Sequence, residues 1–526
     1  MSETAPADAS VLIRGLADPR AFPHPCAGVE VVETHISWVL LAGDYAYKIK
    51  KPVALGFLDF STLARRRFYC QEELRLNRRL APRLYLDVVP ITGPRTAPRV
   101  DGDGPVLEYA VRMRRFAQQA LLTRHPLDGA LIDRLTLRIA DFHAGLPPAP
   151  PDAPYGAPDA VMAPMRENFT HILGVAHDSA VRAAARRLER WTALGFVRLR
   201  ERLEARRRQG FVRECHGDLH RGNIAVIDGE PLIFDCIEFN PALRWIDTVS
   251  ELAFLVMDLR EAGETALARR CLNGYLERTG DYAGLGLLRF YAVYRAMVRA
   301  KVIAIRLSQP SLDEVARADA RMELSRYLRL ARGMALRRQR RLIITCGLSG
   351  SGKTRLCGLL REALPLIHLR SDVERKRLFG LAADARTASP PGAGIYGSRA
   401  SRRTYGRLLD LARSILDAGF GVIVDATFLK RAQRARFRDL AAELGCGFSI
   451  LVLDAPVPVL RRRILRRLAA GADASEAGLA VLEAQIAARE SLTLEEHRSA
   501  LLLETERPGQ VAGLVGRLLG ALPDRG

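Results

Sequence analysis

The sequence predicts a protein of two domains, the second of which is an α/β domain built on a parallel sheet. Three observations support this: the chain length, a glycine-rich loop between a strand and a helix, and a β-hairpin with polar residues at one end. A chain of 526 residues is too long for a single hydrophobic core. A basic stretch at 331–341 precedes an apolar strand, so we place the boundary there, giving domains 1–335 and 336–526.

Composition bounds the class of protein. Hydrophobic residues make up 48% and charged residues 26%, as in ordinary soluble proteins, and we find no run of about twenty apolar residues that could span a membrane. The first ten residues lack a basic-then-apolar layout, so no secretion signal is expected. The eight cysteines are scattered without a C-x-x-C pair, which predicts reduced thiols, a cytoplasmic protein and no zinc site.

The net charge of +21 has two interpretations. A strongly basic chain is typical of proteins that bind nucleic acid. The arginines are, however, spread along helical patterns instead of gathered in one tail, as in proteins rich in arginine, alanine and leucine generally. We therefore keep a nucleic-acid partner as an alternative that is not favoured, because an anionic nucleotide needs only a local basic site.

Residues 342–354, LIITCGLSGSGKT, read as a buried strand and a phosphate-binding loop, and a helical pattern with one apolar face follows. The glycines let backbone N–H groups close around phosphate oxygens, Lys353 reaches the β- and γ-phosphates, and Thr354 offers a hydroxyl to Mg²⁺. The sequence thus predicts ATP and Mg²⁺ as cofactors. The expected ATP-binding residues are Gly347, Leu348, Ser349, Gly350, Ser351, Gly352, Lys353 and Thr354.

Two acidic residues of the second domain follow apolar strand patterns. Asp425, in GFGVIVDATF (419–428), is the expected metal partner, with helix capping as the alternative. Asp372 lies in LIHLRSDVERKRL (366–378), where Ser371 and Glu374 have the spacing of a capping box. Asp372 is therefore either a first-turn acid stabilised by the helix dipole, or the base that accepts a proton from a substrate hydroxyl, with Arg375 holding an anion.

The run VLRRRILRR (459–467) places Arg463 and Arg467 on one helical face. It is either a solvated basic helix or a lid over the γ-phosphate. Together with the phosphate-binding loop, RSDVERK and VIVDATF, it resembles the small P-loop kinases grouped with polynucleotide kinase, gluconate kinase and zeta toxin, over roughly 341–510. The resemblance implies phosphoryl transfer to a hydroxyl, with Asp372, Arg463 and Arg467 as catalytic residues, and leaves the acceptor unidentified.

In the first domain, ECHGDLHRGNIAVIDGEPLIFDCIEFN (214–240) predicts a hairpin with Asp228-Gly229 as its turn. Asn223 lies five residues before the turn and Asp235 six after it, so the hairpin returns Asp235 to the end where Asn223 lies. With Asp218 nearby, these oxygen ligands suit Mg²⁺ that bridges nucleotide phosphates. The Asp218-to-Asn223 spacing equals that of the kinase catalytic loop. The alternative is a hairpin with polar ends and no site. His216 and His220 are expected to hold the loop by hydrogen bonds.

HGDLHRGN with a downstream FD resembles the aminoglycoside phosphotransferase and choline kinase group, a branch of the α+β protein-kinase-like fold. The resemblance implies that Asp218 is the catalytic base and that Asn223 and Asp235 hold the metal. It also implies a small lobe with a strand lysine and a helix glutamate. Lys48 and Lys50 point to the same face of one strand, and periodicity does not choose between them.

The resemblance favours Lys48, with Glu73 (or Glu72) as its partner, and edge-strand lysines that only favour solubility are the alternative. The segment LEYAVRM (107–113) would lead into the hinge that receives adenine. A G-x-G-x-x-G loop is absent from this half, and nothing matches the antibiotic-recognition regions of the group, so antibiotic modification is not expected. From about residue 25 to 510 the chain resembles bacterial two-domain proteins in which a phosphotransferase-like domain precedes an ATP-binding kinase-like domain.

The sequence therefore predicts an ATP-dependent phosphotransferase, bifunctional, that acts on hydroxyl acceptors. Its expected partners are ATP and a small-molecule acceptor, without a membrane. The alternatives are an ATP-binding regulatory or RNA-binding protein, and an RNA 5′-hydroxyl kinase in the second domain. Sequence patterns specify neither the acceptors nor the oligomeric state, nor whether the two sites act in series.

Overall fold

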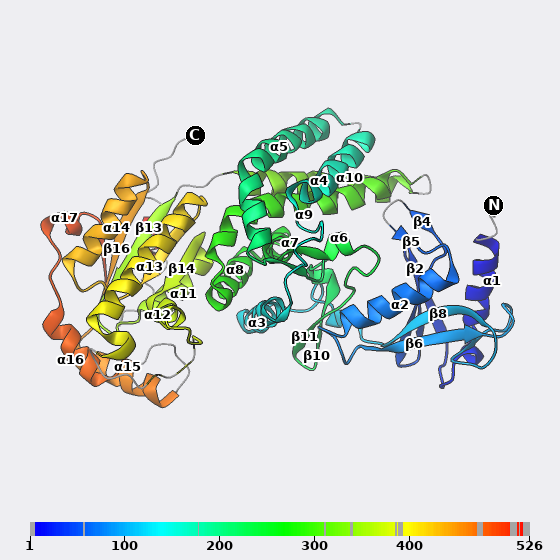
Figure 1. The fold of residues 1–526 in the computed structure, drawn as a ribbon, viewed down its shortest axis with the longest axis horizontal. Helices are drawn as coiled ribbons and strands as arrows, with labels where there is room; N and C mark the ends of the chain where they lie inside the picture. Colours follow the sequence, from blue (N-terminus) through cyan, green and yellow to red (C-terminus); the bar gives the residue numbers. More distant parts are fainter. Residues whose placement is uncertain are drawn as a thin grey trace. The chain divides into compact units, whose positions relative to one another are not determined.

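The computed structural model describes residues 6–504, except 56–57, 177, 310–311, 337–339, 384, 386, 388–392 and 471–476, and also describes 513–514 and 516–518. Contacts divide the chain into two compact units (Figure 1). The first unit comprises Met1–Gly174 and Ala193–Asp258, and the second comprises Val175–Thr192 and Leu259–Gly526. The predicted boundary between 335 and 336 stays a prediction. Among the described residues, every helix is too short or too polar to cross a membrane.

The first unit contains a six-stranded antiparallel sheet in the order β1-β2-β3-β8-β6-β7. Its strands are β1 (Val29–Glu33), β2 (Ser37–Ala42), β3 (Tyr45–Lys50), β6 (Tyr85–Thr92), β7 (Arg99–Val100) and β8 (Val106–Arg114). Helix α1 (Pro6–Leu16) contributes leucines and an isoleucine to the core on one side, and α2 (Leu63–Asn77) packs against β8 and β6. The central strand β3 carries Lys48 and Lys50, and Gly43, with φ of 56°, turns β2 into β3.

The rest of the first unit carries the predicted hairpin. Strands β10 (Ile224–Ile227) and β11 (Glu230–Ile233) pair with Ile227 opposite Glu230. Asp228 and Gly229 both have positive φ, 53° and 77°, as a two-residue hairpin turn requires. The predicted hairpin is therefore confirmed. The unit also contains α3 (Gly129–Gly145), β9 (Val212–Glu214), α6 (Pro241–Arg244), β12 (Trp245–Asp247) and nearly all of α4 (Pro158–Val175) and α7 (Thr248–Glu261), whereas α5 (Ser179–Arg208) begins in the second unit and continues into the first from Ala193. Strands β4 (Ala54–Leu55) and β5 (Leu58–Asp59) pair before α2.

The second unit contains a five-stranded parallel sheet in the order β14-β15-β13-β16-β17, which confirms the predicted α/β fold. Its strands are β13 (Arg341–Cys346), β14 (Leu366–Arg370), β15 (Gly421–Asp425), β16 (Gly447–Asp454) and β17 (Ala500–Glu504). The strands β13 and β15 are almost wholly buried, because helices cover both faces of such a sheet. The chain leaves β13 through the phosphate-binding loop, at the carboxyl edge where open parallel sheets bind ligands.

The helices of this sheet are α11 (Lys353–Ala363), α12 (Ser371–Leu378), α13 (Ser398–Asp417), α14 (Arg431–Glu443), α15 (Val457–Ala470), α16 (Leu479–Ala488) and α17 (Leu494–His497). The same unit includes α8 (Thr265–Thr279), α9 (Leu285–Leu307) and α10 (Glu314–Ala335). Helices α9 and α10 pack along each other, and α8 lies against α11 and β14 (Figure 1). Three helices that precede the P-loop sheet in sequence thus belong to its compact unit.

Candidate functional site

The first candidate site is built around Lys48 on β3. Its Nζ lies 2.8 Å from Oε1 of Glu73 on α2 and 2.6 Å from Oδ1 of Asp235. Burial alone would lower the pKa of Lys48, but Asp235 and Glu73 outweigh it and raise the pKa well above its ordinary value. Lys48 is therefore a permanent cation that joins the strand, the helix and the segment after the hairpin.

Lys50 has a different set of partners. Its Nζ lies 2.8 Å from Oε2 of Glu73 and also pairs with Glu238, and its side chain is fully buried. Both lysines reach the same carboxylate, which confirms that they lie on one face of β3 and contradicts the alternative of edge-strand lysines. Lys48 is the lysine that contacts Asp235, and this supports its assignment as the phosphate-orienting residue.

Asp218, Asn223 and Asp235 come together at one end of the β10–β11 hairpin. Nδ2 of Asn223 donates to the carbonyl oxygen and to Oδ2 of Asp218, at 3.0 and 2.9 Å. The N–H of Phe234 donates to the carbonyl oxygen of Asn223 at 2.9 Å. Asp235, the next residue in the chain, therefore lies beside Asn223. Asp235 has φ of 63°, a conformation that is strained for a residue with a Cβ and that clusters at functional sites. An amide oxygen and two carboxylates thus form the oxygen-donor set that Mg²⁺ prefers.

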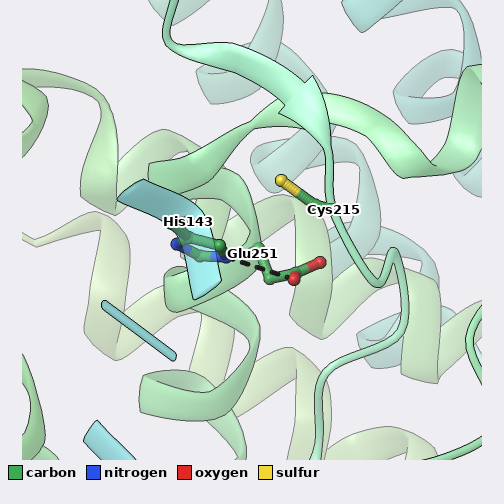
Figure 2. Close-up of side chains that lie close together, drawn as sticks. All are labelled: His143, Cys215 and Glu251. Atoms are coloured by element: carbon green, nitrogen blue, oxygen red, sulfur yellow. Dashed lines mark hydrogen bonds and ion pairs between the residues drawn. The ribbon is translucent and has the colours of Figure 1, made fainter. Parts of the chain in front are cut away.

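A buried glutamate on α7, Glu251, lies beside His143 and Cys215 (Figure 2) and holds the loop that carries Asp218. Oε1 of Glu251 accepts from the N–H of His216 at 2.9 Å, and Oε2 accepts from the N–H of Gly217 at 2.6 Å. His143 contacts Oε1 at 3.3 Å. Burial favours the neutral acid, but the hydrogen bond and charge of His143 prevail and lower the pKa of Glu251 to about 2. His143, Cys215 and Glu251 lie close enough to hold a metal, yet both carboxylate oxygens already serve backbone N–H groups.

The histidines of this loop have the predicted structural role. Nε2 of His216 lies 2.8 Å from the carbonyl of Phe234, next to Asp235, and burial lowers the pKa of this imidazole. Nδ1 of His220 accepts from the N–H of Gly222 at 3.0 Å. Both rings therefore fix the backbone around Asp218 and Asn223, as expected from the sequence.

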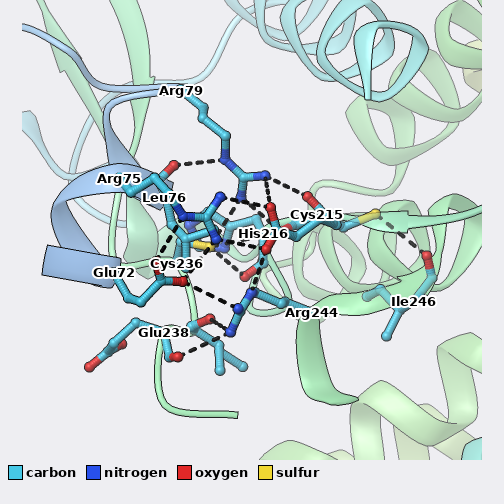
Figure 3. Close-up of polar contacts among 12 residues, drawn as sticks. Glu72, Arg75, Leu76, Arg79, Cys215, His216, Cys236, Glu238, Arg244 and Ile246 are labelled. Carbon is cyan, nitrogen blue, oxygen red and sulfur yellow. Dashed lines mark hydrogen bonds and ion pairs between the residues drawn. The ribbon is translucent and has the colours of Figure 1, made fainter. Parts of the chain in front are cut away.

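An arginine–glutamate cluster ties α2 to the strand that leads into this loop (Figure 3). Arg79 donates to the carbonyl oxygens of Glu214 and Cys215 at 2.7 and 3.1 Å. Its other members are Glu72, Arg75 and Arg244: both arginines pair with Glu214 and with Glu72. Glu72 therefore belongs to this cluster, and Glu73 is the glutamate that pairs with the lysines. The cluster fixes the helix of Glu73 relative to the loop of Asp218.

The second candidate site is the phosphate-binding loop between β13 and α11. Gly350 and Gly352 have φ of 82° and 90°, which only glycine adopts at low cost. A Cβ on Gly347 would lie 2.5 Å from the carbonyl oxygen of Leu453, so side chains are excluded where backbone must approach phosphate. Nζ of Lys353 bonds to the carbonyls of Gly347 and Leu348 at 3.0 and 2.8 Å. Burial lowers the pKa of Lys353, with Asp425 and Asp372 opposing.

Asp425 ends β15 beside Thr354, in the first turn of α11. Nε2 of His368 lies 3.3 Å from Oδ2 of Asp425. Burial would raise the pKa of Asp425, but hydrogen bonds from His368 and Thr354 contribute to lowering it. A carboxylate and a hydroxyl lie together here, which fits Mg²⁺ bound with phosphate. The capping alternative for Asp425 is wrong, because the next helix, α14, begins only at Arg431.

The predicted capping box at the start of α12 is also wrong. The N-cap is Arg370, one residue earlier than expected, and it makes no side-chain capping bond. Ser371 is therefore already helical, and Glu374 is buried and pairs with Arg377 and Arg407 instead. Asp372 lies in the first turn, as expected.

A cavity of about 740 Å³ brings the second-site residues together. It is lined by residues of the phosphate-binding loop and by Asp372, Arg375, Asp425, Arg463 and Arg467. Arg463 donates to the carbonyl of Gly350 at 3.4 Å, and Arg467 donates to Ala477 at 2.6 Å. Both arginines thus face the cavity, which supports the lid interpretation over a solvated helix.

Sequence reasoning missed several residues of both sites. Gln485 on α16 accepts from the N–H of Ser349 at 2.8 Å and has no motif around it, whereas Arg370, which lines the cavity, is the first residue of RSDVERK and was not singled out. The sequence does contain a signal for Glu251 and His368, because each is a polar residue inside an otherwise apolar helix or strand pattern. Such residues are rarely buried without a partner.

Comparisons with known proteins agree with this geometry. A profile of the phosphotransferase enzyme family matches residues 60–288, and a profile of an AAA domain matches residues 342–492. Proteins of Mycobacterium tuberculosis and Mycobacterium bovis, each described as uncharacterised, are 33% identical over 469 residues, which cover 88% of this chain and 90% of theirs. The chain belongs to their family. As predicted, this family member joins an aminoglycoside phosphotransferase- and choline kinase-like domain to a P-loop kinase domain, and both halves are of an ATP-binding phosphotransferase type.

Three solved structures show a weaker likeness. An amicoumacin kinase is 13% identical, covering 61% of this chain and 93% of its own, with a TM-score of 0.38. A choline/ethanolamine kinase family protein of Mesorhizobium loti is 14% identical, covering 62% and 99%, with a TM-score of 0.33. A gluconokinase of Sinorhizobium meliloti is 20% identical, covering 35% and 99%, with a TM-score of 0.25.

Proposed function

We propose that this family member is a bifunctional ATP-dependent phosphotransferase in which each half transfers the γ-phosphoryl group to a hydroxyl. The observation that carries the proposal is the second-site cavity, in which the phosphate-binding loop and Asp425 share a wall with Asp372. A nucleotide-binding protein without catalysis needs only the first two. The further carboxylate gives the site a group that can accept a hydroxyl proton.

In the first site, Asp218 accepts the proton of the acceptor hydroxyl, and Lys48 orients the phosphates. Glu73 holds Lys48 in place, and Asn223 fixes the carboxylate of Asp218 through its amide N–H. Positioning of this kind accounts for most of the rate in phosphoryl transfer, because little covalent chemistry is left to the protein. Glu251 keeps the loop of Asp218 fixed and does not touch the reacting atoms.

In the second site, Asp372 accepts the hydroxyl proton, and Lys353 and the loop N–H groups bind the nucleotide. Arg463 and Arg467 neutralise the charge that develops on the transferred group. Mg²⁺, where bound, would be held by Asn223 and Asp235 in the first site and by Thr354 and Asp425 in the second, and it supplies charge neutralisation on the triphosphate. The protein's own part is to orient both reactants and exclude water.

Incubation with ATP and a pool of cellular metabolites, followed by mass spectrometry, tests this function. We expect products that gain a phosphoryl group. Asp218→Asn should abolish one set of products and Lys353→Ala another, while each variant keeps the other set. If neither variant changes any product or the rate of ATP consumption, the proposal is wrong.

A second candidate function, an RNA 5′-hydroxyl kinase in the second domain, is favoured by the side chain of Arg375. Arg375 on α12 is 8% exposed, its Nη1 donates to the carbonyl of Ile395 at 2.9 Å, and its Nε has no acceptor. Within the described residues no carboxylate pairs with it. A buried cation one turn after Asp372 suits an anionic acceptor, and an RNA 5′ end is one such acceptor. Phosphorylation of 5′-hydroxyl RNA, with binding that weakens steeply with salt and is lost in Arg375→Gln, would support this candidate over a small metabolite.

A regulatory role is the remaining alternative, motivated by the net charge of +21. It predicts ATP binding and salt-dependent RNA binding without any phosphoryl transfer. Binding of RNA that is absent, or that does not respond to salt, would remove it.

A further inference from the structure

Helix α8 completes the edge of the P-loop sheet. By sequence α8 lies within the part matched by the phosphotransferase enzyme family, but its contacts place it in the second unit. Nδ2 of Asn273 donates to the carbonyl of Leu366 at 3.1 Å, and its side-chain oxygen accepts from the N–H of His368 at 2.8 Å. These are the two bonds that a neighbouring strand would make with β14. The side chain thus covers part of the exposed edge of β14.

The same helix holds the end of α11. Arg269 donates to the carbonyls of Glu362 and Ala363, both at 2.8 Å, which are among the orphan acceptors at the C-terminus of that helix. Arg270 pairs with the side chain of Glu362 at 2.6 Å. Helix α11 begins at Lys353 of the phosphate-binding loop. Helix α8 therefore contacts both elements that lead to the second site.

One residue of α8 contacts a residue that lines the second-site cavity. Oε1 of Glu277 lies 2.8 Å from Nη1 of Arg370, and Oε2 lies 3.6 Å from Arg361. The carbonyl of Glu277 accepts from Arg377 at 2.5 Å. Arg370 ends β14, lines the cavity and precedes Asp372 by two residues. Glu277 thus fixes the segment that carries the proposed base from both sides, through Arg370 before it and Arg377 after it.

We propose that Glu277 is a positioning residue of the second site, supplied by the phosphotransferase half of the sequence; this rests on the function proposed above for Asp372. Glu277 keeps the Arg370 guanidinium directed to α8. Without that carboxylate, the guanidinium loses its bond to α8 and can turn to a carboxylate of the cavity, Asp372 or Asp425. An Asp372–Arg370 pair would occupy the carboxylate that must accept the hydroxyl proton. The second site therefore works only when α8 is seated against β14.

Turnover of MgATP with water as acceptor tests the proposal in the full-length Asp218→Asn protein. In Glu277→Gln we expect kcat to fall roughly tenfold or more and KM for ATP to change less than about twofold, because the phosphate-binding loop is untouched. Glu362→Gln is the matched control: it removes another carboxylate that pairs with α8, at 2.6 Å, but far along α11 from the loop. Its kcat should match the parent. An equal loss in both variants would overturn the proposal, as would no loss in either.

Arg370→Gln and the double variant separate positioning from general loss of structure. If Glu277 acts through Arg370, the double variant loses no more than Glu277→Gln alone, whereas independent effects would multiply. In the double variant, Arg370→Gln removes the guanidinium that would pair with Asp372, so part of the kcat lost in Glu277→Gln should be restored. A further loss in the double variant would contradict the proposed role.

Hydrogen exchange distinguishes failure of this inference from failure of the proposed function. If the Asp218→Asn protein shows no turnover that depends on Lys353, the function proposed for the second site is wrong. Exchange still decides the role of Glu277 in that case. We expect faster exchange over residues 366–378 in Glu277→Gln and unchanged exchange there in Glu362→Gln. Equal exchange in both variants would show that Glu277 does not position this segment.

Discussion

Nζ of Lys48 and Oδ1 of Asp235 lie 2.6 Å apart, although 187 residues separate them in the sequence. The contact closes a network in which Glu73 binds Lys48 through one oxygen and Lys50 through the other. One lysine thus faces the carboxylate expected to hold metal, and its neighbour stabilises the glutamate behind it. The two lysines should therefore respond differently to substitution.

Lys48→Met should abolish function and leave the fold largely intact. Measured as MgATP turnover in the Lys353→Ala background, kcat should fall by about a hundredfold or more, because the lysine is proposed to orient the phosphates. The thermal midpoint should fall less than in the Lys50 variant, since the other partner of Lys48, Asp235, is partly exposed, whereas the other partner of Lys50, Glu238, is buried. Undiminished turnover in Lys48→Met would show that the lysine is not part of the site.

Lys50→Met should instead destabilise the first domain. The substitution leaves Glu73 and Glu238 buried with one cation fewer, and breaking a buried pair in this way costs about 3–5 kcal/mol. Chemical denaturation followed by circular dichroism measures this loss. Lys51→Met is the control, because Lys51 pairs with the exposed Glu33 and should lose about 1 kcal/mol or less. Similar losses in the two variants would contradict the assignment.

The free energy of unfolding of the first domain should decrease in acid as Glu251 becomes protonated. Its folded pKa of about 2 lies below the ordinary value of 4.5, so its stabilisation is complete above pH 4.5 and is lost as pH falls towards 2. Fully developed, the shift corresponds to about 3 kcal/mol. The difference in unfolding free energy between wild type and Glu251→Gln should therefore shrink between pH 5 and pH 2.5. A difference that stays constant over this range would rule out the depressed pKa.

Gly347→Ala should weaken ATP binding at the second site. The added Cβ would meet the carbonyl oxygen of Leu453 at 2.5 Å, a backbone atom, so the phosphate-binding loop must move. We expect a loss of about tenfold or more in affinity for a fluorescent ATP analogue. Gly358→Ala in α11 is the control: nothing lies within 4 Å of its added Cβ, and the helix should gain up to about 1 kcal/mol. Weaker binding in both variants would count against a local effect.

The features that sequence predicted well are those set by consecutive residues. The phosphate-binding loop, the Asp228-Gly229 hairpin and the parallel strands each follow from local chemistry that tertiary contacts did not override. The convergence of Asn223 and Asp235 followed from counting residues on either side of a turn. Such local rules predict the type of an element more reliably than the residues where it begins and ends. The predicted capping box at Ser371 was wrong for this reason, because α12 begins one residue earlier than expected.

The residues that sequence could not place act across long separations. Glu251 binds a loop 34 and 35 residues away, and Glu277 binds Arg370 across 93 residues. No spacing rule connects such pairs, because only the packing of α7 and α8 brings them together. The choice between Lys48 and Lys50 was of the same kind: periodicity put both on one face, and Asp235 distinguished them only in three dimensions.

The number of ATP sites per chain tests the central claim most directly. Isothermal titration of the purified protein with a non-hydrolysable ATP analogue and Mg²⁺ should give two sites per chain. Lys48→Met and Lys353→Ala should each leave one site, and the double variant should leave none. A single site in the wild-type protein, or one that survives in the double variant, would contradict the account of two independent nucleotide sites.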